Sequence, residues 1–379
     1  MTRGGPRARW LRLLAPAPWD AVSGGSAYDR EVVRALRERG ADVEVLLVDG
    51  AWPAPSPEDR RRLADALAVV GGADVVVDGL LAAAAPREVA AAVAAGARVH
   101  VLVHLPLALE GGLDPARAAA READEGAALR AATSVVATSR WAARDLRARH
   151  GLGRVGVAVP GTRSAPLARG SAGGAGRAAP QLLQLASVAP RKDQLGVVTA
   201  LARVRDLPWT AVLAGPVADA AYATAVDDAV AAAGLPERVR RPGPVGGAAL
   251  EAVWDATDLL LLPSRAETWG LAVTEALARG VPAVVGAGTG AVEALLGEGG
   301  HDDVAGVVVT PGDPAALAGA VRRMLGPGGP AARRAAARRR EELAASGGWD
   351  ATAAALLGHL DHPVHQPGHH LDDEQGARP

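Results

Sequence analysis

Several residue types are missing from this chain of 379 residues. It contains no cysteine, isoleucine, asparagine or phenylalanine, and its 41 basic residues include a single lysine. Without cysteine, thiol nucleophiles, cysteine-ligated zinc, iron–sulfur clusters and disulfides are excluded. No run of about eighteen apolar residues occurs, so no membrane-spanning helix is predicted. The formal net charge of -1 gives no general attraction to nucleic acid. We expect a protein that binds no nucleic acid.

The beginning of the chain is basic and only weakly apolar. Arg9–Pro18 is too short and too rich in proline for the apolar segment of a signal peptide, so we expect a cytoplasmic location. A weak peripheral contact with a membrane would use the basic and aromatic side chains of this segment, which are Arg3, Arg7, Arg9, Trp10 and Arg12. A solvated start of the first strand is the favoured interpretation.

Short apolar runs alternate with alanine-rich amphipathic stretches along the whole chain. This alternation is typical of a parallel sheet covered by helices, and therefore of an α/β fold. In the first half we predict strands at Trp10–Leu14, Val43–Val48, Val75–Val77, Val99–Leu105, Ser134–Ala137 and Val155–Val159, with helices at Tyr28–Arg39 and Trp141–Arg149. In the second half we predict strands at Leu182–Ser187, Val212–Ala214, Val239–Arg241, Leu259–Leu262, Ala283–Val285 and Gly306–Thr310.

Length and composition predict two domains. The first covers residues 1–162, and residues 163–180, rich in glycine, alanine, serine and proline, read as a flexible linker or long loop. The second covers residues 181–345, and a last helix at 349–361 is expected to pack back on the first domain. Residues 362–379 are polar and broken by proline, which predicts a disordered tail. Five of the nine histidines lie from His359 onward, where a low-complexity terminus is favoured over a metal site.

The segment Leu259–Val285 carries the most chemistry per residue. A buried strand ends at Pro263, and Glu267 follows where the strand's carboxyl end meets a helix start, the place where open parallel sheets bind ligands. Glu275 is eight residues later, about two helical turns, and lies on nearly the same face. A solvated helix residue is the plain alternative for Glu275, but its neighbours are apolar. We therefore predict that the two carboxylates line one edge of a ligand crevice.

The order of these residues resembles the nucleotide-sugar site of retaining glycosyltransferases with the GT-B fold, the large family-4-type group. In that family two acidic residues separated by seven others mark the donor site, as Glu267 and Glu275 do here. The resemblance implies that Glu275 binds ribose hydroxyls and that Glu267 faces the donor sugar. It also implies donor-binding roles for further residues of the acidic segment and of the base-side loop, namely Ser264, Gly270, Leu271 and Gly243.

The single lysine, Lys192, lies in the stretch SVAPRKDQ after a predicted strand. A lysine in an arginine-rich chain suggests a site that needs a compact point charge. The stretch resembles the same family's basic segment, in which an arginine and a lysine hold the diphosphate of the donor. Lys192 falls on the family's lysine, whereas Ser187 stands at the usual arginine and Asp193 at the usual glycine. Arg191 is then expected to supply the missing charge.

The first half also carries parts of the resemblance. Gly24 and Gly25 match the family's glycine loop, and His104, at a predicted strand end, matches its histidine near the transferred sugar. His100 and His104 cannot chelate one ion, because four residues of a strand span roughly 13 Å. Gly286–Ala291 matches a dinucleotide fingerprint only weakly and is interpreted as a donor-site loop.

Taken together, the resemblance implies two Rossmann-like domains facing a central cleft. The expected reaction is transfer of a sugar from a nucleoside-diphosphate sugar to a hydroxyl acceptor with retention, and the catalytic candidates are Lys192, Arg191, Glu267 and His104. No cofactor is expected, and no Asp-x-Asp motif predicts a metal ion. A sugar-nucleotide epimerase or phosphorylase, a two-domain binding protein and a catalytically impaired nucleotide-sugar-binding protein stay open as alternatives.

Overall fold

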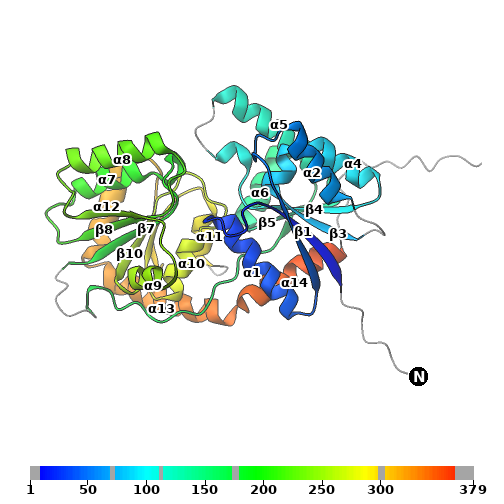
Figure 1. Ribbon diagram of the computed structural model, residues 1–379. Coiled ribbons are helices and arrows are strands. Elements are labelled where there is room, and N and C mark those ends of the chain that lie inside the picture. Colours follow the sequence, from blue (N-terminus) through cyan, green and yellow to red (C-terminus); the bar gives the residue numbers. More distant parts are fainter. Residues whose placement is uncertain (1–8, 69–72, 111–113, 173–178, 298–303, 363–379) are drawn as a thin grey trace, which may run out of the picture.

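The computed structural model describes residues 9–68, 73–110, 114–172, 179–297 and 304–362. Its chain forms two α/β domains, each built on a parallel sheet (Figure 1). The first sheet has the order β2-β1-β3-β4-β5-β6 and the second β12-β11-β10-β7-β8-β9. The predicted α/β architecture is thus confirmed.

All the predicted strands are present, and their ends differ from the prediction by a few residues. The first sheet contains β1 (Trp10–Pro16), β2 (Asp42–Val48), β3 (Asp74–Asp78), β4 (Arg98–Val103), β5 (Ser134–Ala137) and β6 (Gly156–Val157). The second contains β7 (Gln181–Leu185), β8 (Thr210–Ala214), β9 (Val239–Gly243), β10 (Thr257–Leu262), β11 (Ala283–Gly286) and β12 (Gly306–Val309). Most of these strands are apolar runs because helices cover both faces of each sheet.

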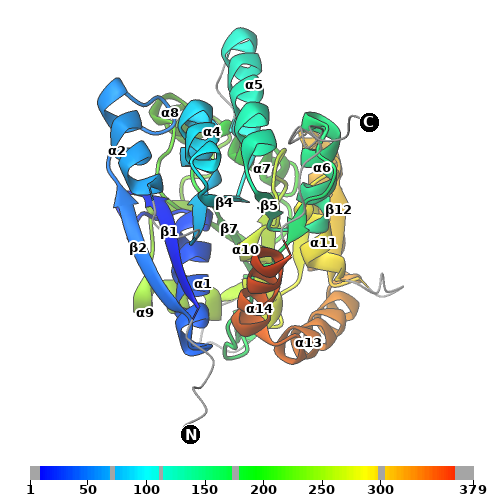
Figure 2. The same ribbon diagram turned by 90° about the vertical axis from the view of Figure 1, so that its right-hand side faces the viewer.

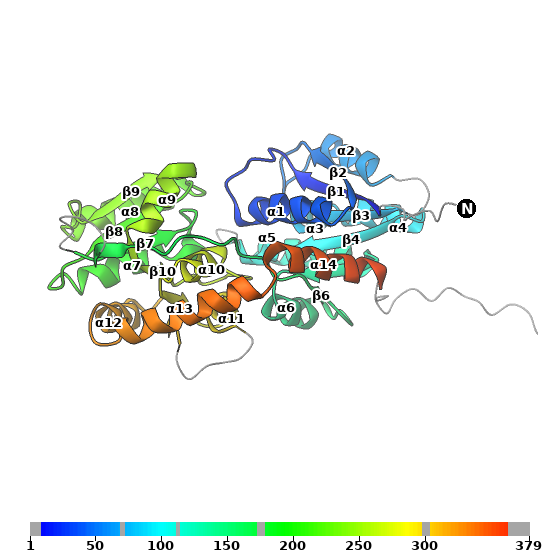
Figure 3. The same ribbon diagram turned by 90° about the horizontal axis from the view of Figure 1, so that it is seen from below.

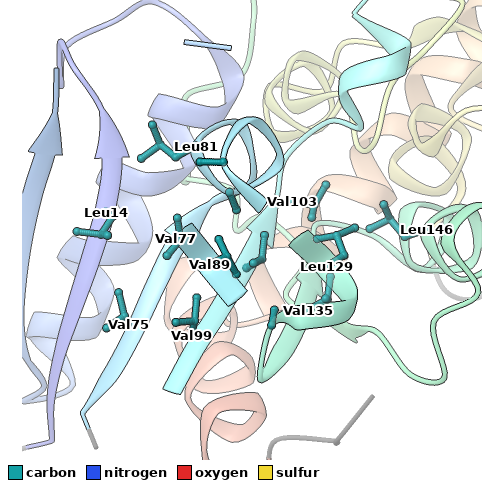
Figure 4. Packing of buried hydrophobic residues seen from close by; sticks show 14 of the residues in the cluster. Leu14, Val75, Val77, Leu81, Val89, Val99, Val103, Leu129, Val135 and Leu146 are labelled. Carbon is teal, nitrogen blue, oxygen red and sulfur yellow. The ribbon is translucent and has the colours of Figure 1, made fainter. Parts of the chain in front are cut away.

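In the first domain, helices on both faces build two cores. One face carries α2 (Pro57–Leu67), α3 (Gly79–Ala84), α4 (Pro86–Ala94), α5 (Pro115–Ala131) and α6 (Arg140–His150). The close-up of Figure 4 shows the core beneath these helices, in which Leu14, Val75, Val99 and Leu129 pack together. The opposite face carries α1 (Gly24–Glu38) and the last helix, α14 (Gly348–Asp361). Figure 2 shows the two groups of helices on opposite sides of the sheet.

The second domain is layered in the same way. The core on one face is formed mainly with α7 (Gln194–Ala202), α8 (Ala220–Ala232) and α12 (Pro314–Leu325). The core on the other face is formed with α9 (Gly247–Asp255), α10 (Leu271–Ala278), α11 (Gly290–Leu296) and α13 (Gly329–Ala345). None of the helices described here is long and apolar enough to cross a membrane.

The chain returns to the first domain at its end. Figure 3 shows α13 beside the second domain and α14, next in sequence, beside the first. Trp349, Leu356 and Leu360 of α14 are buried in the core that α1 shares with the first sheet. The Thr352 hydroxyl donates to the Val159 carbonyl at 2.7 Å, and Arg9 forms an ion pair with Asp361. The last helix therefore packs on the first domain.

The segment predicted as a flexible linker is fastened to the second domain over its described part. The Ala168 amide donates to the Arg279 carbonyl at 3.0 Å, and the Ser171 amide donates to the Asp258 carboxylate. Arg340 donates to the Ala165 carbonyl at 3.1 Å. These hydrogen bonds give partners to backbone groups of the segment. The composition, which is typical of a flexible linker, did not predict them. Residues 173–178 of the linker and 363–379 of the predicted tail lie outside the described residues.

The starts of two helices change the interpretation of the predicted site residues. The Ser23 side chain accepts from the Ser26 amide and caps α1, so Gly24 and Gly25 form its first turn and not a preceding loop. Helix α10 begins only at Leu271, after Gly270 in the left-handed region at a φ of 85°. Glu267 therefore lies outside the helix that carries Glu275. The expected relation of the two acids by two helical turns is wrong.

Candidate active site

A cavity of about 540 Å³ lies between the carboxyl ends of the two sheets. It opens where the strand order reverses, between β1 and β3 in one sheet and between β7 and β10 in the other. Ligands bind at such switch points in open parallel sheets. The cavity brings together most of the predicted site residues, which are Gly24, Gly25, His104, Arg191, Lys192, Glu267, Gly270, Leu271 and Glu275.

Three predictions for this site are corrected by the structure. Gly243 does not line the cavity, because it ends β9, and the next residues, Pro244 and Val245, reach it instead. Ser264 is fully buried behind Glu267 and donates to its Oε1 at 3.0 Å. The Gly286–Ala291 loop contributes no lining residue either. Its Gly290 amide donates to the Glu267 carbonyl at 2.7 Å, so the loop supports the acidic segment from behind.

Lys192 and Glu267 form a buried ion pair at the wall of the second domain. Burial and the nearby charge of Arg191 lower the pKa of Lys192, although the charge of Glu267 opposes them. For Glu267, burial raises the pKa, but the charges of Lys192 and Arg191 and the hydrogen bonds from Lys192 and Ser264 outweigh it. The net pKa of Glu267 is lowered, so this carboxylate is ionised near neutral pH.

The backbone around Lys192 explains how the lysine reaches the cavity. The lysine ends a short 3-10 turn, Pro190–Lys192, and its carbonyl accepts from Gln184 Nε2 at 2.7 Å. Asp193 follows in the left-handed region at a φ of 56°, the conformation that favours the glycine expected at this position. Its carboxylate accepts from the Gly312 amide at 3.2 Å and from Arg265 at 3.1 Å. Aspartate therefore stands at position 193 where the family has glycine, and its side chain anchors the turn.

Arg191 and Ser187 both line the cavity next to Lys192. The Arg191 carbonyl accepts from the Arg265 amide at 2.8 Å, and the Ser187 carbonyl accepts from Gln194 Nε2 at 2.9 Å. These bonds hold both backbones without using either side chain. A guanidinium is thus present at position 191 on the same wall from which the resemblance expects one at position 187.

Glu275 lines the cavity from α10. Burial raises its pKa to about 7, with Arg279 opposing the shift and Glu251 adding to it. Arg279 donates to the Glu251 carboxylate at 2.7 Å, so its charge is already engaged. A carboxyl group that is costly to ionise and lies in a cavity is a candidate for binding a polar ligand.

The wall of the first domain begins with the first turn of α1. Gly24 and Gly25 place the N-terminus of this 15-residue helix at the cavity, where its amides favour an anion or a polar oxygen. A side chain at Gly25 would lie 3.1 Å from the His104 ring. Glycine at this position therefore lets the helix approach the histidine.

His104 lies beside two buried aspartates, Asp29 and Asp78, that the sequence did not predict as site residues. Its Nε2 donates to Asp29 Oδ1 of α1 at 2.9 Å and lies 3.8 Å from Asp78 Oδ2, at the end of β3. The ligand atoms of the three side chains lie within 4.8 Å of one another, a spacing that a metal ion would accept. One signal was available, since Asp29 occupies the apolar face of α1 between Tyr28 and Val32.

The other strand histidine is not part of this site. His100 is fully buried in β4, with Nδ1 bonded to Ser134 at 2.7 Å and Nε2 to Asp74 at 2.9 Å. Asp74 begins β3, so this pair lies at the amino ends of the strands, away from the cavity. The expectation that His100 and His104 do not share a ligand agrees with these positions.

Hydrogen bonds join the two domains. The Thr268 hydroxyl of the second domain donates to the carbonyl of His104. Glu293 of α11 accepts from the amides of Arg140 and Trp141, at 3.1 and 2.8 Å, and so caps α6 of the first domain. The structure thus holds His104 close to the segment that carries Glu267.

Comparison with known proteins shows which family and which relatives this chain resembles. Residues 174–341 match the family described as Glycosyl transferases group 1. The D-inositol 3-phosphate glycosyltransferase of Kineococcus radiotolerans is 30% identical over 279 residues, which are 68% of this chain and 64% of the relative. The enzyme of the same name from Salinispora tropica is 36% identical over 127 residues, 34% of this chain and 25% of the relative. The chain thus matches less than two thirds of the length of these curated relatives.

Solved structures share the whole architecture. A sucrose-phosphate synthase from Thermosynechococcus elongatus has a TM-score of 0.77 at 21% identity, covering 93% of this chain and 98% of that one. Anabaena Alr3699/HepE, solved in complex with UDP and glucose, has a TM-score of 0.70 at 17% identity, covering 93% and 99%. These likenesses show the GT-B fold, two Rossmann-like domains around a cleft. Residues 174–341, which include most of the second domain, thus resemble the glycosyl transferases group 1 family in sequence.

Proposed function

We propose that this protein is a retaining glycosyltransferase that moves a sugar from a nucleoside-diphosphate sugar to a hydroxyl acceptor without a metal ion. The observation that carries the proposal is the meeting of Lys192, Arg191 and Glu267 with His104 and the N-terminus of α1 around one cavity. The resemblance to the glycosyl transferases group 1 family and the GT-B fold support glycosyl transfer. The UDP and glucose in Alr3699/HepE support a nucleotide sugar as the donor.

In this proposal the diphosphate binds to Arg191 and Lys192. Glu275 receives the ribose hydroxyls, and the base lies beside Pro244 and Val245, which line the same cavity. The sugar then lies between Glu267 and His104, and the acceptor enters along the first domain. A cytoplasmic location and a weak membrane contact by the basic first segment stay predictions from the sequence.

The chemistry follows from the charges. The bond between the anomeric carbon and the phosphate oxygen breaks, and negative charge develops on the departing diphosphate. Preorganised cations at that oxygen are the largest expected contribution to the rate. A bond forms between the acceptor oxygen and the anomeric carbon on the same face, and the hydroxyl proton passes to the departing phosphate. No protein nucleophile takes part, so Glu267 and His104 orient and stabilise the sugar.

Donor binding is tested by a thermal-shift screen of UDP, GDP, ADP and their glucose conjugates, with and without EDTA. A ligand that binds the native state raises the apparent stability, by about 2.7 kcal/mol at a hundred times its dissociation constant. We expect one nucleoside diphosphate and its sugar to raise Tm equally well in EDTA. The absence of any shift contradicts the proposal, and a shift that EDTA abolishes contradicts metal independence.

Transfer is tested by release of the nucleotide. The acceptor panel begins with D-inositol 3-phosphate, because two relatives carry that acceptor in their names. We expect free nucleoside diphosphate to appear only when an acceptor is supplied, together with a product that has the anomeric configuration of the donor. Conversion of the donor to its epimer without an acceptor would indicate an epimerase on the same fold, and dependence on inorganic phosphate would indicate a phosphorylase.

A further inference from the structure

Three buried side chains from different elements meet at the wall of the first domain. Asp29 lies on α1, Asp78 ends β3, and His104 follows β4. Asp29 and Asp78 are 2% and 8% exposed, and the His104 side chain is 14% exposed and reaches the cavity. One carboxyl group is enough to orient an imidazole by a hydrogen bond. The second carboxyl group therefore needs a further explanation.

The contacts of the ring fix its orientation. Nε2 is bonded to Asp29, and the Cδ2 edge packs against Gly25, so both of these edges face the first domain. The Tyr28 ring meets the imidazole edge to face at 5.1 Å, and its hydroxyl donates to the Ala158 carbonyl at 2.9 Å. Among the residues that the structure describes, no side chain or backbone group bonds to Nδ1. This atom is therefore the polar edge of the ring that is left for a ligand.

The charges around the ring favour its protonated form. Burial lowers the pKa of His104, but the charge and hydrogen bond of Asp29 and the charge of Asp78 outweigh burial and raise it to about 9. Burial raises the pKa of Asp78 to about 6, with His104 opposing and Asp29 adding to the shift. At pH 7 to 8 the ring is thus an imidazolium that carries a proton on both nitrogens.

We propose that Asp29 and Asp78 are positioning residues that hold His104 protonated, with Nε2–H directed into the first domain and Nδ1–H presented to the cleft. This inference rests on the proposed function, in which Nδ1–H donates a hydrogen bond to an oxygen of the bound nucleoside-diphosphate sugar. Asp29 and Asp78 act on the reaction through His104. Their effect on the reaction therefore depends on pH.

Other charged groups share the cavity with the ring, and the test must separate their titration from that of His104. From the first domain these are Arg30, Asp78 and Glu110, and from the second domain Arg191, Lys192, Glu267 and Glu275. Among them, the pKa of Glu275 is raised to about 7 and the pKa of Lys192 is lowered, so both titrations can enter a pH profile. A direct reading of the histidine ring is therefore needed beside any measurement of turnover.

The direct reading is an NMR titration of the histidine ring signals in the 15N-labelled full chain, with His104→Gln identifying the signals of His104. We expect the wild-type ring to stay protonated up to about pH 8, since its pKa is about 9. Asp29→Asn should lower the pKa more than Asp78→Asn, because Asp29 is both closer and hydrogen-bonded. A wild-type pKa at or below the ordinary value of 6.5 overturns the inference. This reading needs no donor and no activity, so it is decided even if the proposed function is wrong.

The second reading is the pH profile of turnover with the donor found in the thermal-shift screen. In Asp29→Asn, turnover should fall roughly 10–100-fold at pH 8, the scale for one lost hydrogen bond to a charged group, and recover towards the wild-type rate near pH 6. The matched control is Asp74→Asn, which breaks the His100 pair at the far end of the strands and should leave the profile unchanged. If Asp29→Asn does not fold, Asp78→Asn carries the same test with a smaller shift. A profile that is equally reduced at both pH values assigns Asp29 a structural role only and overturns the positioning.

Discussion

Each wall of the cavity carries one buried cation beside a buried carboxylate, yet the two pairs behave in opposite ways. In the second domain Lys192 pairs with Glu267, and in the first domain His104 pairs with Asp29. Burial lowers the pKa of both cations. For Lys192 burial prevails, whereas for His104 the two nearby carboxylates prevail and the pKa rises. The balance of neighbouring charges therefore decides the outcome, and not burial alone.

The difference assigns different tasks to the two walls. Beside Lys192, Arg191 adds a second positive charge, so these two cations outnumber Glu267, the carboxylate paired with Lys192. An anion that binds there reduces the repulsion between Lys192 and Arg191. Beside His104, the aspartates already compensate the imidazolium, so this wall attracts an anion less strongly. The comparison thus predicts that the leaving diphosphate depends mainly on the second domain.

Replacing the lysine tests this assignment most strongly. Lys192→Ala removes the cation nearest to the proposed leaving group, and we expect turnover to fall roughly 10²–10³-fold, the usual loss for one such group. The same change leaves the Glu267 carboxylate buried without its partner, which costs up to about 3–5 kcal/mol of stability. Turnover is therefore measured well below the Tm of the variant, with folding checked by circular dichroism.

A double variant separates the two consequences of that change. Lys192→Ala with Glu267→Gln removes the unpaired buried charge, so most of the lost stability should return while turnover stays low. Near-normal turnover of the folded Lys192→Ala variant would refute the role of the lysine at the diphosphate. It would also end the assignment of the leaving group to the second domain.

Arg191 and Ser187 sharpen the same comparison. Arg191→Ala should lower kcat/KM for the donor roughly 10–100-fold, since hydrogen bonds to charged groups contribute about 1.5–3 kcal/mol. Because Ser187 lines the same wall, Ser187→Arg in that background should restore part of the loss. Full activity of Arg191→Ala, or no rescue by Ser187→Arg, would show that the diphosphate does not bind at this part of the wall.

The sequence predicted the strands well and the helix starts less well. The strands are apolar runs because both faces of each sheet are covered, and such runs are visible without any structure. The start of α1 was placed too late, because two glycines are poor helix formers and the Ser23 cap overcomes their cost. The expected relation of Glu267 and Glu275 by two helical turns was wrong, because the left-handed Gly270 lies between Glu267 and the start of α10.

The two walls differ in the same respect. Lys192, Glu267 and Glu275 lie in short segments whose order alone marks a site. Asp29 and Asp78 are 49 positions apart in sequence, and they meet His104 only because β3 and β4 are neighbours and α1 brings Asp29 to the ring. A charged residue on the apolar face of α1 signals a buried partner. Which partner it meets depends on the sheet order, which the sequence pattern does not specify.

Glu275 provides the last and smallest test, because it is a half-buried acid of the cavity whose neighbouring cation, Arg279, is paired with Glu251. Its pKa of about 7 lies above the ordinary 4.5, so the fold favours the protonated form, and this stability is lost as pH rises through 7. Glu275→Gln mimics that form. Its Tm relative to wild type should therefore be unchanged near pH 4.5 and should rise by about 2–4 °C per kcal/mol regained at pH 8.

The same residue separates binding from chemistry. Glu275→Ala should raise the donor KM about tenfold, equivalent to about 1.4 kcal/mol, while kcat changes little, because ribose contacts stabilise the ground and transition states alike. Steady-state kinetics at pH 8 measure both constants. If kcat falls instead and KM stays constant, Glu275 acts at the reacting centre. The uncompensated acid would then contribute to the chemical step, as the compensated pairs on the two walls are proposed to do.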